Sequence, residues 1–274
     1  MREHRVSWAA AERIAAGLSE RDQAIADAVG RVRVLTGRQL ERLHFADLQG
    51  AHRDRTRRRV LARLVSLQVL TTLERRIGGA RAGSAGLVFT LGLVGQRLAT
   101  LSPNLSPNQG SVTAGRARQP HTPTDRFLKH SLAVSELYVQ LVELARQQSF
   151  TLAGFQGEPA CWWLDSAGSW IKPDAYVCLE TTDVTDNWAV EVDQATESLP
   201  TLRRKLSAYL QLAERGENGP DDEVLPRVLI TVPDERRHTA VRELVEELPD
   251  PAECLFAVVV QQRAARFMAQ MLRE

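Results

Sequence analysis

The sequence is poor in cysteine, lysine and aromatic residues, and it has no long apolar run. Its three cysteines, Cys161, Cys178 and Cys254, lie far apart and form no Cys-x-x-Cys pair, so a disulfide framework is not expected. We expect three buried thiols in a reducing cytoplasm. No stretch approaches the roughly 18 apolar residues that cross a bilayer, and no apolar run follows the basic N-terminus. The sequence therefore predicts neither a membrane contact nor a secretory signal.

Nucleotide-binding motifs and zinc spacings are also absent. There is no Gly-x4-Gly-Lys-Ser/Thr and no Gly-x-Gly-x-x-Gly after a strand, so a nucleotide-driven motor or a dehydrogenase is not supported. The histidines show neither a His-x-His nor a His-Glu-x-x-His spacing, and His130 is interpreted as a packed or exposed helix residue rather than a ligand. What remains is the ordinary composition of a globular protein, long enough for one large or two modest domains.

The net charge of +1 hides two oppositely charged halves. Residues 1–120 contain 20 Arg, no Lys and nine Asp or Glu, a formal charge of +11, whereas residues 121–274 carry −10. This asymmetry predicts that the N-terminal part meets a polyanion. A GC-rich coding bias also favours Arg over Lys, so the argument depends on the charge and not on the choice of Arg.

Three helices followed by a β-hairpin are predicted in the first hundred residues. Ser19 and Thr36 can cap the first two helices, and apolar spacing predicts a third helix over Asp54–Leu67. Two β-like runs around a Gly-rich tip form the hairpin, and a short helix closes the segment. This order is typical of a winged helix, so residues 1–100 are predicted to be a winged-helix domain.

The third predicted helix is rich in arginine. In a winged helix it occupies the position from which side chains enter the major groove, while the hairpin reaches phosphates or the minor groove. We therefore predict that this domain binds double-stranded DNA. The alternatives are a solvated basic face and a winged helix that binds protein, although protein binding would not need a basic hairpin. The candidate DNA-binding residues are Arg53, Arg55, Arg57, Arg58, Arg59, Arg63, Arg75, Arg76 and Arg81.

A stretch rich in Pro, Ser, Asn and Gly separates the two parts. Residues 101–124 contain two Ser-Pro-Asn units and no apolar periodicity, which indicates a linker or a long exposed loop. Downstream, a helix over Asp125–Arg146 precedes several strand-like runs, after which helices and strands alternate. This α-β-β-β-α-β-α-β order predicts an α/β (α+β) domain over residues 125–274, with a mixed sheet flanked by helices.

Three carboxylates are expected to converge on two paired strands of this second domain. If the strands on either side of Asp183 form a hairpin, Asp174 falls opposite Glu191 or Asp193, within one step of register. Glu191 and Asp193 are two residues apart and share one strand face. Carboxylates so placed repel one another unless a cation or proton lies between them. We therefore predict a Mg²⁺ or Mn²⁺ site at Asp174, Glu191 and Asp193, with a solvated strand face as the alternative.

The same pattern resembles the core of the PD-(D/E)xK nucleases. Asp174, preceded by Pro, matches the first motif of that superfamily, and Glu191 matches the acid of the second, but Asp193 stands where the family usually has Lys. Some members carry that Lys on the following helix, where Lys205 is available. The resemblance implies a restriction-endonuclease-like domain in which Asp174 and Glu191 hold Mg²⁺ and Lys205 stabilises charge at the phosphate. Glu136, on the preceding helix, would assist.

The whole chain is similar to the replication-relaxation family of bacterial plasmids and integrative elements. The similarity is carried by short motifs that begin at Leu35, Phe127 and Val190 and by the Arg-rich helix. It covers residues 17–262 and implies a role in maintaining or transferring mobile DNA, with replication or conjugation proteins as further partners. Asp193 in the Lys position leaves a second interpretation open, a non-enzymatic DNA-binding regulator or replication accessory whose nuclease-like domain contacts partners.

Overall fold

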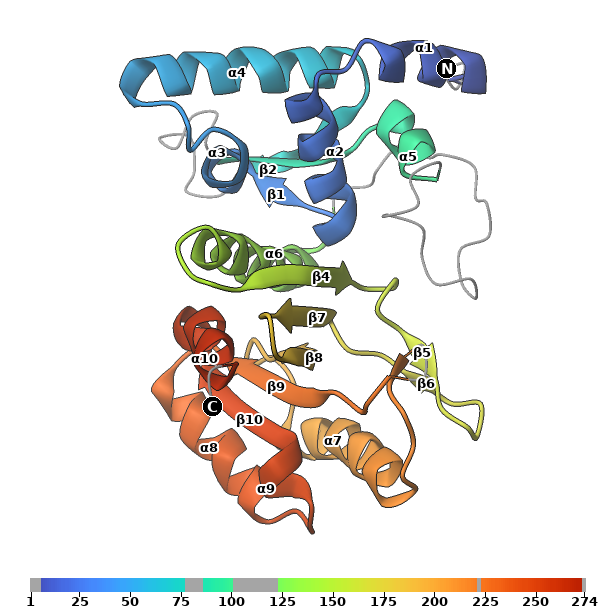
Figure 1. Cartoon of the computed structure of the whole chain (residues 1–274), viewed down its shortest axis with the longest axis vertical. Helices are drawn as coiled ribbons and strands as arrows, with labels where there is room; N and C mark the ends of the chain where they lie inside the picture. The colour runs from blue at the N-terminus through green and yellow to red at the C-terminus, as the bar shows by residue number, and fades with distance from the viewer. Residues whose placement is uncertain (1–5, 77–85, 101–122, 221–222, 273–274) are drawn as a thin grey trace. The chain divides into compact units, whose positions relative to one another are not determined.

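The computed structural model describes residues 6–76, 86–100, 123–220 and 223–272. The chain divides into two compact units, unit 1 over residues 1–139 and unit 2 over residues 140–274, each built from helices and a sheet of its own (Figure 1). Helix α6 (Asp125–Ala145) begins in unit 1 and ends in unit 2. The class is mixed α/β, as the sequence predicts.

Unit 1 packs its helices against a three-stranded antiparallel sheet of strand order β1-β3-β2. The central strand β3 pairs Phe89 with Leu35 of β1, and Leu91 with Leu70 of β2. The first half of α6 joins this core, because Leu128 packs in a cluster with residues of the sheet. The other elements are α1 (Trp8–Ala16), α2 (Glu20–Val32), β1 (Leu35–Thr36), α3 (Gly37–His44), α4 (Gly50–Ser66), β2 (Leu70–Arg76), β3 (Leu87–Leu91) and α5 (Leu93–Ala99).

Reciprocal side-chain caps fix the starts of α2 and α3. The Ser19 side chain accepts a hydrogen bond from the amide of Asp22, whose carboxylate accepts one from the amide of Ser19. Thr36 and Gln39 repeat the arrangement. Each pair satisfies amides that a helix start leaves without partners. Both helices therefore begin where the sequence predicts.

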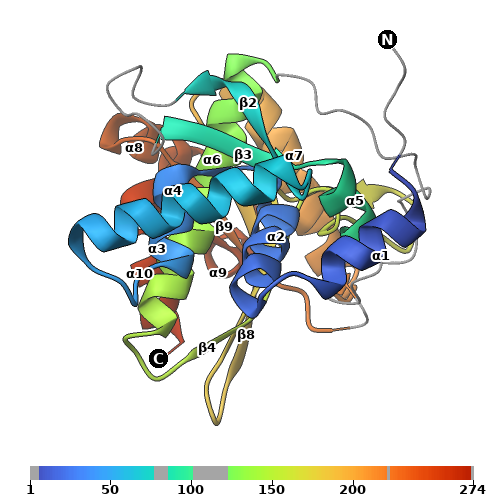
Figure 2. The same ribbon diagram turned by 90° about the horizontal axis from the view of Figure 1, so that it is seen from above.

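The helix α4 begins one turn earlier than apolar spacing predicts, at Gly50 rather than Asp54. Its C-terminal half lies across the start of α2 (Figures 1 and 2), where Arg63 reaches Asp22. The short helix α5 closes against the chain between α4 and β2. Close approach there requires a glycine, because a Cβ at Gly95 would lie 2.1 Å from the carbonyl oxygen of Val69.

Unit 2 is built on a five-stranded mixed sheet of order β10-β9-β8-β7-β4. The middle strand, β8, is antiparallel to β7 and parallel to β9. A separate two-stranded hairpin, β5–β6, lies between β4 and β7 in the sequence. The elements are β4 (Thr151–Gly157), β5 (Trp163–Leu164), β6 (Trp170–Ile171), β7 (Ala175–Glu180), β8 (Thr185–Val192), α7 (Leu199–Glu214), β9 (Arg227–Val232), α8 (Glu235–Glu246), α9 (Ala252–Leu255), β10 (Phe256–Val260), the 3₁₀ turn η3 (Gln261–Arg263) and α10 (Ala264–Met271).

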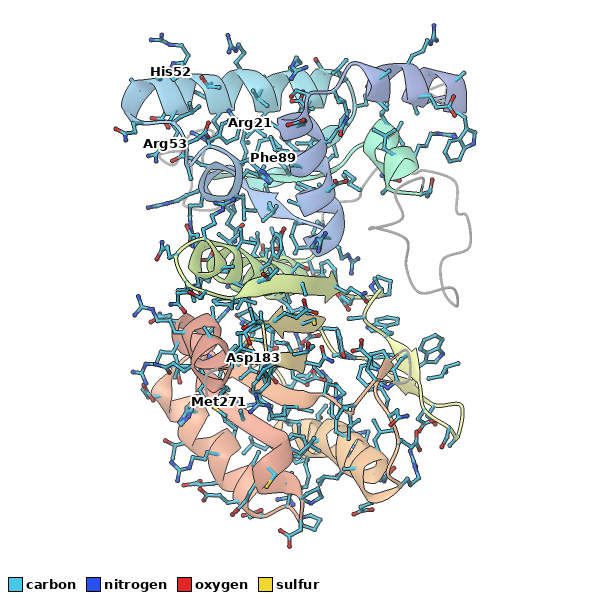
Figure 3. The ribbon with its side chains drawn as sticks, viewed as in Figure 1. Arg21, His52, Arg53, Phe89, Asp183 and Met271 are labelled. Carbon is cyan, nitrogen blue, oxygen red and sulfur yellow. The ribbon has the colours of Figure 1, made fainter. Side chains whose placement is uncertain are left out.

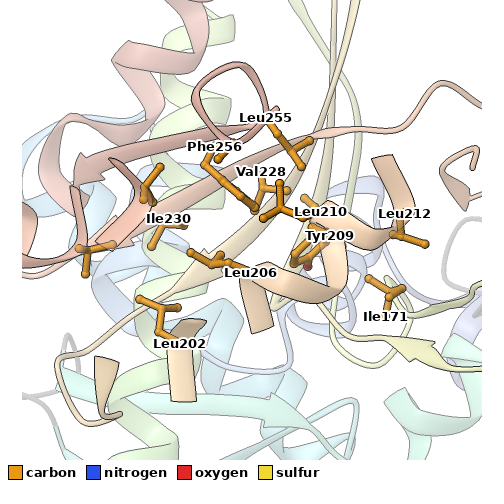
Figure 4. Close-up of a cluster of buried hydrophobic side chains, with 14 of the residues drawn as sticks. Ile171, Leu202, Leu206, Tyr209, Leu210, Leu212, Val228, Ile230, Leu255 and Phe256 are labelled. Atoms are coloured by element: carbon orange, nitrogen blue, oxygen red, sulfur yellow. The ribbon is translucent and has the colours of Figure 1, made fainter. Parts of the chain in front are cut away.

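The apolar face of α7 forms much of the core of unit 2. Leu202 and Leu206 pack with Ile230 of β9 and with residues of β10 and α9 (Figure 4). The helix begins at the N-cap Ser198, whose side chain accepts a hydrogen bond from the amide of Thr201, with Pro200 in its first turn. This packing fixes which residues of α7 point toward the sheet.

Of two further expectations from the sequence, the structure contradicts one, and the other lies almost wholly outside the described residues. Cys161 is buried, but Cys178 is partly exposed and Cys254 is exposed, so the prediction of three buried thiols is wrong. The expected linker falls outside the described residues except for its last two positions. In the described part of the chain, no helix has the length and apolar content needed to cross a membrane.

Candidate functional site

The pairing of β7 with β8 places Asp174 beside Glu191. Ala175 pairs with Val190, and the amide of Asp174, just before β7, donates to the carbonyl of Val190 at 2.9 Å. The Asp174 side chain lies along β8, where Oδ2 accepts a hydrogen bond from the amide of Val192 at 2.7 Å. Asp174 and Glu191 are buried, with 8% and 3% of their surface exposed. The register predicted from the turn near Asp183 is therefore correct.

Both carboxylate oxygens of Glu191 are bound from α7. The Lys205 ammonium donates to Oε2 at 3.0 Å, and the Tyr209 hydroxyl donates to Oε1 at 2.8 Å. The two donors are four residues apart and so project from one face of the helix. The Lys205 side chain is 38% exposed, whereas Tyr209 is buried. Lys205 therefore lies beside the acid to which the nuclease resemblance links it, and Tyr209 is a further partner of Glu191.

Burial and charge shift the pKa values of this group. Burial, and then the charge of Asp174, raise the pKa of Glu191 to about 7, against the opposing effect of Lys205 and Tyr209. Burial alone would lower the pKa of Lys205, but the Glu191 and Asp174 carboxylates outweigh it and raise that pKa. Burial and Glu191 also raise the pKa of Tyr209, which therefore keeps its proton. One ammonium is thus shared by two buried carboxyl groups.

Asp193 has partners of its own. Arg237, at the start of α8, donates from Nε to Asp193 Oδ2 at 2.6 Å, and the amide of Ala195 donates to Oδ1 at 2.7 Å. The same guanidinium donates to the carbonyl of Glu197, so it also fastens the loop between β8 and α7. Across the described ranges, no group of three or more His, Cys, Asp and Glu side chains is placed to hold a metal. The expected gathering of all three carboxylates is therefore not observed.

Glu136 lies in unit 1. Its Oε1 accepts a hydrogen bond from Arg42 at 2.7 Å, and its Oε2 accepts one from Gln39 at 3.0 Å. These contacts join α6 to α3. The role that the nuclease resemblance implies for Glu136 has no support in these contacts, so we leave it out of the proposed centre.

Two arginines of α4 pair with Glu41 of α3, Arg57 from a buried position and Arg53 from a partly exposed one. Arg57 is buried, and its Nε lies 2.9 Å from Oε2 of Glu41 in α3, without the alignment of a hydrogen bond. Arg53 Nε lies 3.2 Å from the other oxygen of Glu41, on the side of α4 that faces α3 (Figure 3). Arg57, a candidate DNA-binding residue in the sequence, is therefore buried on the inner side of the helix by its ion pair with Glu41.

The other predicted arginines differ in their partners. Arg63 donates to both oxygens of Asp22 at 2.6 Å while its side chain stays 44% exposed. Arg55, Arg58 and Arg59 are exposed, and none of them has a carboxylate partner among the residues that the structure covers. The side chains of Arg75 and Arg76, and all of Arg81, lie outside the described residues.

Comparison with known families gives one match. The family model described as replication-relaxation matches residues 27–228. The matched segment runs from within α2 into β9, so it includes the Arg-rich helix α4, the β7–β8 pair and all of α7. No curated protein matches the chain.

Proposed function

The chain belongs to the replication-relaxation family, and from this premise we propose that it is a DNA-binding protein of a plasmid or other mobile element that cleaves DNA with a divalent cation. Unit 1 binds duplex DNA, and unit 2 carries the catalytic centre. The catalytic residues are Asp174, Glu191 and Lys205. Replication or conjugation proteins would be its further partners.

The observation that carries the proposal is the contact between Lys205 and Glu191 beside Asp174. The 3.0 Å contact joins α7 to β8. Lys205 does not occupy the usual Glu-x-Lys position, yet it lies beside the same acid, Glu191, that a Lys at that position would accompany. A PD-(D/E)xK nuclease uses the same parts: an acid before one strand, an acid on the next strand, and a basic side chain between these acids and solvent. Their meeting from three places in the sequence supports the resemblance.

Asp174 and Glu191 fit a Mg²⁺ or Mn²⁺ ion. Magnesium sites that act on phosphates often use one or two carboxylates and complete the coordination with water and substrate. Burial, and then the charge of Asp174, raise the pKa of Glu191, and a divalent cation held by both carboxylates would relieve their repulsion. Asp193 is not included, because its partner Arg237 is only 15% exposed and also binds the carbonyl of Glu197, so it is fixed in place, unlike the partly exposed Lys205.

Each residue has a separate task in the proposed reaction. Asp174 and Glu191 hold the cation, which when bound polarises the phosphate and lowers the pKa of water. Lys205 is partly exposed, so its ammonium can turn from Glu191 toward a phosphate and stabilise the negative charge that develops there. Tyr209 keeps its proton and its contact with Glu191 throughout.

The DNA-binding assignment depends on the arrangement of unit 1. The order α2, β1, α3, α4, β2, β3 with sheet order β1-β3-β2 supports the assignment of unit 1 as a winged helix. In that arrangement α4 is the helix that enters the major groove. Its exposed Arg55, Arg58 and Arg59 are free to meet phosphates or base edges.

The deciding experiment is cleavage of supercoiled and branched DNA by the full chain with Mg²⁺ and with EDTA. We expect cleavage only with the metal, and a loss of at least about 100-fold in Lys205→Met. Asp174→Asn is preferred to Ala, because Asn can still accept the hydrogen bond from the buried amide of Val192. Arg242→Ala, in an exposed pair of α8, is the matched control and should cleave normally.

One observation favours a second candidate, a non-enzymatic DNA-binding regulator. Asp193 stands where the nuclease pattern has Lys, and it is bonded to Arg237 as part of the framework of the loop. A wild-type chain that binds DNA but leaves every substrate intact with Mg²⁺ or Mn²⁺ would establish this candidate and eliminate the nuclease.

A further inference from the structure

The two side chains that bind Glu191 differ in charge and in exposure. Tyr209 is a neutral donor in the core of unit 2, where its ring lies 6.5 Å from that of Trp163. Lys205 is a cation at the rim of the site, and its ammonium also lies 4.0 Å from Glu197. They bind opposite oxygens of one carboxylate. One donor can therefore orient the carboxylate while the other neutralises its charge.

On the basis of the proposed function, we infer that Tyr209 is a positioning residue that holds Glu191 for a divalent cation, and that Lys205 competes with this cation until it is displaced. Neither residue would be a ligand. Both roles apply before DNA binds. Side chains of the centre itself thus regulate how tightly it binds the cation.

The case for Tyr209 is geometric. Its hydroxyl fixes Oε1 of Glu191 at 2.8 Å, and a neutral hydroxyl can keep this contact while Oε2 binds a cation. Hydrogen bonds to a ligating carboxylate orient it, and their loss commonly weakens metal binding by about 10- to 100-fold. The ring is locked by core packing among residues such as Leu206 and Val228, so the donor cannot move to another partner without disturbing the core.

The case for Lys205 is electrostatic. Its ammonium lies 3.0 Å from Oε2, so a divalent ion bound to that oxygen would meet a positive charge at close range. The side chain is long, flexible and partly exposed, so it can be expelled without unpacking α7. Removing its charge should therefore strengthen metal binding, even though it abolishes the proposed cleavage.

The test is titration of the full chain with Mn²⁺ in the absence of DNA, followed by electron paramagnetic resonance of the free ion. Tyr209→Phe should raise the dissociation constant about tenfold or more, whereas Lys205→Met should lower it at least about threefold. Lys205→Arg keeps the charge and should stay near the wild-type value. Tyr138→Phe and Lys129→Met, both on the part of α6 that belongs to unit 1, are the matched controls.

Tyr209→Phe must weaken Mn²⁺ binding, and Lys205→Met must strengthen it. A Tyr209→Phe chain that melts like the wild type in EDTA and binds Mn²⁺ equally well overturns the positioning role. A Lys205→Met chain with unchanged or weaker binding overturns the competition. A wild-type chain that binds no Mn²⁺ overturns the proposed metal centre and this inference with it, whereas a wild-type chain that binds with the wrong ranking of variants overturns this inference alone.

Discussion

The unpaired charge of α4 lies at the surface of unit 1, whereas the excess charge of the β7–β8 pair lies beneath the surface of unit 2. In α4, Arg57 is buried against Glu41, and Arg55 and Arg59 face solvent. In unit 2, Asp174 and Glu191 are buried, and the partly exposed ammonium of Lys205 contacts Glu191. The two regions have opposite signs of charge and opposite degrees of exposure.

This difference shows why formal charge alone is a poor guide to a site. An exposed cation is well solvated and can exchange water for a phosphate at little cost. A buried carboxylate pair has already lost its water, so it favours a cation or a proton. Under the proposed function, the +11 half and the −10 half of the sequence would therefore bind different partners, a polyanion and a cation.

The largest expected effect is on DNA binding by the exposed arginines. Replacing Arg55, Arg58 and Arg59 together with Ala should weaken binding of duplex DNA by the full chain about 100-fold at low salt. It should also lower the slope of log affinity against log salt by about 3, because three phosphate contacts are lost. Fluorescence anisotropy at several salt concentrations measures both quantities. Equal slopes for variant and wild type would show that α4 is not the contact surface.

A smaller effect is expected on stability, where buried Arg57 and exposed Arg55 should differ. Arg57→Ala should lower the free energy of unfolding by about 2 kcal/mol, because it leaves Glu41 with one cation fewer at a poorly solvated position. Arg55→Ala should stay within about 0.5 kcal/mol of the wild type. Urea denaturation followed by circular dichroism compares the two. If both variants lost the same free energy of unfolding, the buried ion pair of Arg57 would contribute no more to stability than an exposed arginine does.

The smallest effect is a pH dependence of stability at Glu191. A carboxyl group whose pKa is raised on folding, here to about 7 by burial and Asp174, binds its proton more tightly in the folded chain. Its contribution is complete below the unfolded pKa and is lost as the pH rises through the folded pKa. From pH 6 to pH 8, the wild type should therefore lose about 1 to 2 kcal/mol relative to Glu191→Gln. Parallel stability curves for the two proteins would contradict the raised pKa.

The elements were largely predictable because local signals define them. The caps at Ser19, Thr36 and Ser198 and the apolar spacing of α7 specify helix starts and faces, and the polar turn near Asp183 specifies the β7–β8 register. The meeting of Lys205 and Glu191 follows from these two facts together. The short elements α1, β1, β6, α9 and α10 were not predicted.

The partners of the charged residues were much less predictable. Arg237 reaches Asp193 across 44 residues, and Glu41 reaches Arg57 from another helix. Neither pair has a spacing that a sequence pattern can reveal, because tertiary packing decides it. Tyr209 did carry a signal, since it follows Lys205 by four residues, but on the apolar face of a helix a tyrosine is expected to pack rather than to bind a carboxylate.

The central position of β8 also has a consequence for hydrogen exchange. Its backbone is hydrogen-bonded to β7 on one side and to β9 on the other. At the end of β8, where the pairing with β7 has stopped, the amide of Val192 donates to the Asp174 side chain, and the amide of Asp193 donates to the carbonyl of Thr231. Amides so enclosed exchange with solvent only when the sheet itself opens, so they should be among the slowest in unit 2. If the proposed centre meets DNA, its adjustment must come from side chains such as Lys205, since the backbone that carries Glu191 moves only with the whole sheet.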